Sequence, residues 1–157
     1  MFNHIGRLEG ILNRNFRSAI LAILVLGILG SAAELLLLEH TDGWWQLTPL
    51  LLMGFCVLVL VWHWLDRGRA PVRGLQFTMI LFVLSGFAGT LLHYQGNAEF
   101  ELERDPSLSG WALFSDTMTG ATPALAPGTM MLLGLIGLLY TLGHPALTDG
   151  NEPAILE

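Results

Sequence analysis

Four long apolar stretches constrain this sequence more than any other feature. They cover residues 18–38, 47–65, 75–94 and 125–142. A bilayer core about 30 Å thick is crossed by about 20 helical residues, because backbone groups in lipid must form their hydrogen bonds within the chain. We therefore expect an all-α integral membrane protein, with one domain of 157 residues and four transmembrane helices in an up-down bundle.

Composition supports a membrane class and excludes several others. Hydrophobic residues make up 53% of the chain and charged residues only 13%. The single cysteine, Cys56, excludes an intramolecular disulfide and a thiolate zinc cluster, since each needs at least two thiols. A net charge of -6 argues against nucleic acid, which is bound through clustered cations.

The arginines predict the orientation. Six of the seven lie before the first stretch or between the second and third, namely Arg7, Arg14, Arg17, Arg67, Arg69 and Arg73. Positive charge near helix ends is retained in the cytoplasm. We therefore expect an inner-membrane protein with both termini cytoplasmic and with residues 39–46 and 95–122 outside. Pro49, Pro123 and Pro127 fall where helices are expected to begin.

Two amphipathic segments flank the spans. In residues 1–16 apolar side chains recur at helical spacing, which predicts a short helix on the cytoplasmic membrane surface. The outer connection 95–122 is expected to form a lid. Its residues 98–103 alternate in polarity, which predicts a strand-like segment with three carboxylates on one side. Residues 107–118 predict an amphipathic helix capped by Ser107, with Trp111 and Phe114 at the depth of the lipid headgroups. The three carboxylates are Glu99, Glu101 and Glu103.

Glu34 is the one formally charged residue inside the first stretch. A carboxylate near the outer end of a span needs a partner or a proton. One interpretation is a proton or cation site, or a metal ligand. The other is a structural ion pair with Arg104 that fixes the lid.

His40 and His93 end the first and third stretches, and an up-down bundle puts both on the outer face. With Glu34, and with Glu39 or an acidic residue of the lid, they form a candidate site for zinc, manganese or iron. The sequence contains no HxxxH or ExxH pair that would force two ligands onto one helical face. We therefore favour histidines that form interfacial hydrogen bonds under the lid.

His63 and His144 are expected to lie at the cytoplasmic end, where two facing histidines suit a haem. His63 stands between Trp62 and Trp64, which is typical of an aromatic belt at the membrane interface. We favour the belt, and the sequence leaves quinone binding open because that binding has no recognisable motif.

The sequence carries no phosphate loop, nucleophile elbow or HExxH motif. We expect a non-catalytic accessory or structural subunit, without cofactor, whose partners are the bilayer and other membrane subunits or further copies of itself. The alternative is a metal-, haem- or proton-handling redox or transport component centred on Glu34, His40 and His93. A third hypothesis is a small homodimeric transporter that uses Glu34.

Overall fold

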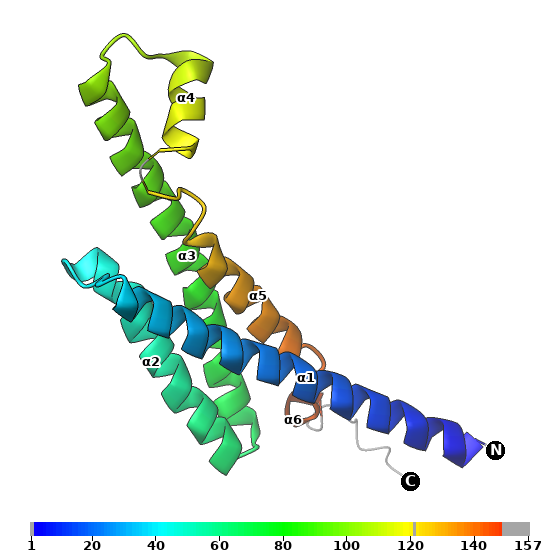
Figure 1. Cartoon of the computed structure of the whole chain (residues 1–157). Coiled ribbons are helices and arrows are strands. Elements are labelled where there is room, and N and C mark those ends of the chain that lie inside the picture. The colour runs from blue at the N-terminus through cyan, green and yellow to red at the C-terminus, as the bar shows by residue number, and fades with distance from the viewer. Residues whose placement is uncertain (1, 121, 149–157) are drawn as a thin grey trace.

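A computed structural model of the chain describes residues 2–120 and 122–148, with side chains from residue 13 onward. Within these ranges all regular structure is helical, as the sequence predicts. The six helices, drawn in Figure 1, are α1 (Phe2–Leu37), α2 (Trp44–Leu65), α3 (Arg69–Arg104), α4 (Gly110–Met118), α5 (Gly128–Thr141) and α6 (Pro145–Thr148).

Three helical segments are long and apolar enough to cross a membrane: Asn13–Leu37, Trp44–Leu65 and Arg69–Arg104. They contain the first three stretches that the sequence predicts as spans, except for Leu38 at the end of the first. The fourth stretch corresponds to α5, which is apolar but has only 14 residues. Most large side chains on the outer surface of the helices are apolar and exposed, as expected where lipid is the solvent.

The most extensive helix contact joins α3 to α5, which run side by side in Figure 1. Glycines let the two backbones approach. A Cβ at Gly134 would lie 2.7 Å from the carbonyl oxygen of Met79, and one at Gly86 would lie 2.7 Å from the backbone nitrogen of Met131. Around this pair, buried apolar side chains from α1, α2 and α3 form the core; they include Leu24, Ile28, Met53, Leu75 and Phe82.

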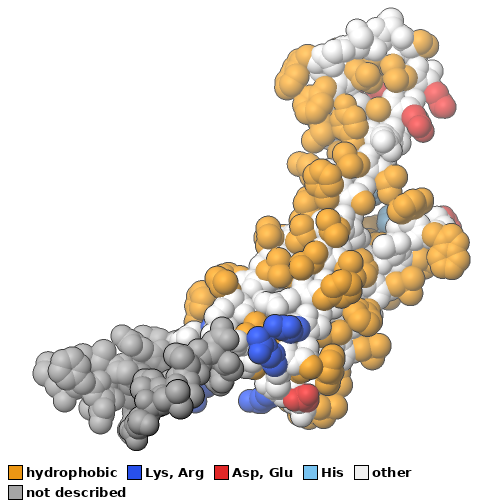
Figure 2. All heavy atoms as spheres, turned by 180° about the vertical axis from the view of Figure 1, so that it is seen from behind, with side chains coloured by type: hydrophobic (Ala, Val, Ile, Leu, Met, Phe, Trp, Pro, Cys, Tyr) orange, Lys and Arg blue, Asp and Glu red, His pale blue; other side chains and the backbone are white. Residues whose placement is uncertain are grey.

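The two ends of the molecule differ in charge. Figure 1 shows α3 extending beyond the other long helices, with α4 folded back along its last turns. We call α4 and residues 95–104 of α3 the head. The opposite end carries Arg17, Arg67, Arg69 and Arg73, and we call it the arginine end. Figure 2 shows arginine side chains at that end and acidic side chains on the head.

The predicted strand-like segment at 98–103 is wrong, because these residues continue α3 to Arg104. Six alternating residues do not distinguish a strand from a helix, and alanine, glutamate and leucine are strong helix formers. On the helix, Asn97 and Glu101 lie four residues apart and face the same way, and both are buried. Burial of that face by α4 determines the helical outcome.

Three other boundaries differ from the prediction. The separate helix expected over residues 1–16 is continuous with the first span in α1, and the apolar side chains of residues 2–12 lie outside the described part. Helix α2 begins at Trp44, so Pro49 lies inside it. Helix α4 begins after Ser109; Ser107 instead donates from Oγ to Asp105 Oδ1 at 2.6 Å.

Candidate functional site

The pair formed by His40 and His93 is positioned by an unusual helix end. At the end of α1, the N–H of His40 donates to the carbonyl of Leu35 and the N–H of Glu39 to that of Leu36. This Schellman pattern needs a left-handed residue, usually glycine, between helix and loop. Here the residue is Glu39, whose φ is 52°. The turn directs the chain so that His40 lies beside α3.

His40 and His93 lie close together, with ring centroids 6.5 Å apart and planes tilted by 46°. His93 Nδ1 donates to the carbonyl oxygen of Pro123 at 3.2 Å, so its Nε2 has no proton when the ring is neutral. Burial, and to a lesser extent the neighbouring His93, lower the pKa of His40 below its usual value of 6.5. The pair therefore favours the neutral, ligand-competent form of at least one imidazole.

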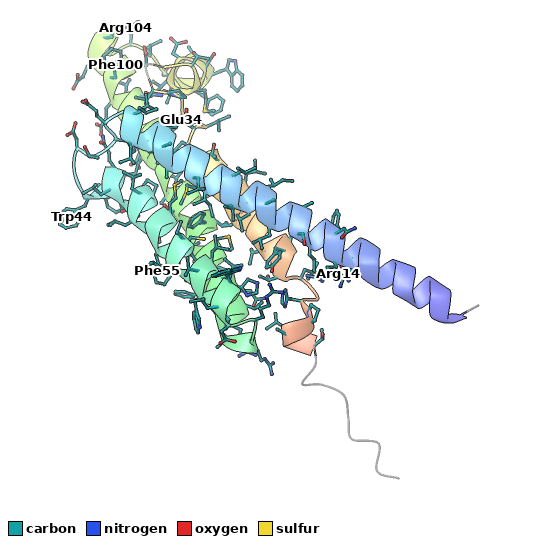
Figure 3. All side chains as sticks on the ribbon, turned by 60° about the horizontal axis from the view of Figure 1, so that its bottom comes forward. Arg14, Glu34, Trp44, Phe55, Phe100 and Arg104 are labelled. Carbon is teal, nitrogen blue, oxygen red and sulfur yellow. The ribbon has the colours of Figure 1, made fainter. Side chains whose placement is uncertain are left out.

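Glu34 does not complete a metal site with these two rings. Its side chain is exposed on α1, as Figure 3 shows. Across the described part of the chain, no group of three or more His, Cys, Asp or Glu side chains has the geometry to hold a metal ion. The structure thus joins two of the three predicted ligands and leaves the third apart.

Arg104 contacts Glu101 and not Glu34. Its Nη2 lies 2.6 Å from Glu101 Oε2, one turn earlier on α3, although the two groups lack the alignment of a hydrogen bond. This is the only ion pair among residues 13–120 and 122–148. Of the three predicted acidic residues, Glu99 and Glu103 are exposed, whereas Glu101 is 4% exposed and faces α4. The helix therefore separates carboxylates that a strand would have aligned.

Asn97 holds the head together, and no motif in the sequence marks it. Its Nδ2 donates to the carbonyls of Thr117 and Thr122 at 2.9 and 2.7 Å. Its Oδ1 accepts from the N–H and the hydroxyl of Thr122 at 3.2 and 2.6 Å. One buried amide thus ties α3 to α4 and to the segment before α5. The only sequence signal for this role is that Asn97 lies four residues before Glu101, so that the two share one face of a helix.

A second polar cluster lies at the arginine end. His63 Nε2 and the Tyr140 hydroxyl are 2.7 Å apart, and both side chains are buried. The His63 and His144 rings contact edge to face at 5.5 Å and 71°. The two predicted histidines therefore meet, but in direct contact, which leaves no space for a porphyrin between them.

Arg17 closes this cluster from α1. Its Nη1 donates to the Tyr140 carbonyl at 2.7 Å, and its Nη2 donates to those of Leu142 and Gly143 at 2.9 and 2.7 Å. These carbonyls lie at the C-terminal end of α5 or just after it, where carbonyl groups lack helical partners. A cation there also complements the helix dipole. Burial first, then His63 and Arg17, lower the pKa of His144. The cluster fastens α5 to α1 and α2.

A groove between α1 and α2 has a volume of about 250 Å³. Its lining is entirely apolar: Val25, Ile28, Leu29, Val57, Leu60, Val61 and Trp64. A small-molecule site needs a few polar groups to orient its ligand, and this groove supplies none.

Comparison with protein-family models, with curated proteins and with solved structures found no match to this chain.

Proposed function

We propose that the chain is a four-span inner-membrane protein that acts without chemistry of its own, as an accessory or structural subunit of a larger membrane complex. The observation that carries the proposal is how the polar side chains are used. Asn97, Arg17 and His63 each make contacts that hold one helix to another. Side chains in these roles are not available to a substrate.

In the proposed topology α5 is the fourth span. Its 14 residues rise only about 21 Å, which is less than the hydrocarbon thickness. The turns before it extend the rise, since the N–H groups of Ala126, Gly128 and Thr129 each donate to the carbonyl three residues earlier. Close packing of α5 on α3 shields its backbone from lipid. Four spans put the arginine end in the cytoplasm and the head outside.

The test is the size of the native assembly. Membranes that contain the chain are extracted with a mild detergent and separated by native electrophoresis, with detection by an antibody. We expect migration in one discrete assembly much heavier than small multiples of 17.2 kDa. Migration of the whole population as a monomer or a small homo-oligomer would refute the subunit role.

The approach of His40 and His93 favours a second candidate function, the binding of a divalent cation at the outer face. Two imidazoles leave the remaining coordination positions to water or to a partner's side chain. Calorimetric titration of the purified protein with Zn²⁺ tests it. Binding at one site per chain that is lost in both His40→Ala and His93→Ala would support it, whereas equal binding by wild type and variants would exclude it.

A further inference from the structure

The head is a helical hairpin that extends beyond the other long helices, as Figure 1 shows. Helix α3 has 36 residues and is about 54 Å long, whereas the hydrocarbon core is about 30 Å thick. If residues 75–94 cross the membrane, residues 95–104 add about 15 Å beyond it. Helix α4 packs against this extension, and the Asn97 hydrogen bonds hold the hairpin closed.

One flank of the hairpin is aromatic. Trp111, Phe114 and Met118 recur at positions i, i+3 and i+7 and so share one side of α4. The centroid of the Phe114 ring lies 5.1 Å from that of Trp111 and 6.2 Å from that of Tyr94 in α3, with the ring planes tilted in both pairs. Trp111 is 78% exposed. We call the surface formed by Tyr94, Leu102, Trp111, Phe114 and Met118 the aromatic face. Figure 2 shows apolar side chains over much of the head.

Large exposed aromatic side chains outside the hydrocarbon core mark a surface that something covers. The carboxylates around this face limit what that is. Glu99 and Glu103 are exposed on the adjoining side of α3, Asp105 follows them, and the one arginine nearby is held by Glu101. An anionic lipid surface would be repelled, and a second copy of the head would bring like charges together.

We propose that the aromatic face docks into an apolar groove of another protein outside the membrane, and that arginine or lysine side chains border that groove. This inference rests on the proposed function and names the contact through which the subunit joins its complex. Tryptophan and phenylalanine supply the buried anchor, and Glu99 and Glu103 supply orientation and selectivity against anionic surfaces.

The first experiment uses native electrophoresis of three variants. We expect Trp111→Ala with Phe114→Ala to reduce the assembled fraction by about tenfold or more. Glu99→Lys with Glu103→Lys should reduce it as well, because it repels a basic rim. The control is Trp44→Ala, which removes an aromatic side chain that is 81% exposed but lies at the start of α2, outside the head. Thermal unfolding in detergent checks that the variants are folded.

The outcomes separate this inference from the proposed function. A wild-type chain that shows no large assembly defeats the subunit role itself. A wild-type assembly that survives in both head variants leaves the subunit role standing and overturns docking through the aromatic face. Loss in the head variants but not in Trp44→Ala supports docking.

Two further measurements test the other occupants. With Trp44, Trp45, Trp62 and Trp64 changed to phenylalanine, Trp111 is the only fluorophore of its kind. In vesicles of phosphatidylethanolamine and phosphatidylglycerol with brominated chains, we expect its emission to stay unquenched, whereas a chain that keeps only Trp62 is quenched. Quenching of Trp111, or efficient disulfide dimers of purified Trp111→Cys, would overturn the proposal.

Discussion

Asn97 is the residue on which the head depends most. Four hydrogen bonds converge on its amide, and Asn97→Ala leaves their partners on Thr117 and Thr122 unpaired. Unpaired polar groups in a buried contact are destabilising, and we expect a loss of about 2 kcal/mol. Thermal unfolding in detergent measures it, with exposed Gln95→Ala as the control. Equal unfolding temperatures for the two variants would contradict the assignment.

Glu39 holds a backbone conformation that suits glycine better. A non-glycine residue at φ 52° is strained by its Cβ, by about 1 kcal/mol. Glu39→Gly should therefore raise the free energy of unfolding by up to about 1 kcal/mol. Chemical denaturation in mixed micelles measures the change. Glu39→Ala keeps the Cβ and should give no gain, so equal effects of the two changes would rule out backbone strain as the cause.

His144 makes stability depend on pH. Its Nδ1 accepts from the N–H of Ala146 at 3.2 Å, and protonation there would break that bond. Its folded pKa lies below the unfolded value of 6.5, so at lower pH the unfolded state binds more protons. Stability should then rise with pH until about 6.5 and level off above it. His40, whose pKa is also lowered, acts in the same direction.

Unfolding temperatures across this pH range, for wild type and for His144→Asn with His40→Gln, measure the contribution of these two residues. In the double variant, the unfolding temperature should rise less with pH than it does in wild type. An identical pH profile would show that other groups cause it.

At the scale of elements, the α3 and α5 interface depends on glycine. A Cβ at Gly134 meets the Met79 carbonyl and a Val83 methyl at 2.7 Å, so Gly134→Ala forces the helices apart. We expect a loss of about 1–3 kcal/mol in detergent unfolding. Gly54→Ala is the control, because no atom lies within 4 Å of its added Cβ. If the two alanines behaved alike, close packing would not be what holds this pair.

The three long apolar helices were predictable because lipid imposes a local rule on length and polarity that a sequence must satisfy residue by residue. The form of residues 98–103 was not. It depends on contact with α4, which lies beyond the window in which periodicity is read. The same contact decides the partner of Arg104: once α3 continues to Arg104, Glu101 is one turn away.

The same distinction applies to the candidate sites: the order of the helices predicts one contact, whereas the others depend on details of packing. An up-down order of helices predicts that His40 and His93 meet, and their ring centroids lie 6.5 Å apart. The bond between His63 and Tyr140 and the capping of α5 by Arg17 depend on how helices rotate and tilt. Helix rotation is determined by many weak contacts at once, and hydropathy does not carry that information.

At the scale of the whole molecule, the proposed orientation has a direct test. In spheroplasts, a membrane-impermeant maleimide should label Ser115→Cys on the head at once, but Arg69→Cys at the arginine end only after the membrane is permeabilised. The native Cys56 is buried in α2 and serves as the unlabelled background. Labelling of both sites in intact spheroplasts would reject the proposed topology. Labelling of Arg69→Cys alone would reverse it.

The unbroken length of α3 has a mechanical consequence. No break in α3 separates its arginine end from the head, so in the proposed topology the helix acts as one rod that reaches both sides of the membrane. A change in tilt of about ten degrees displaces one tip relative to the other by about 9 Å. In that topology a partner that tilts the head also displaces the arginines on the far side, and a thicker or thinner bilayer, which alters helix tilt, changes the height at which the head is presented.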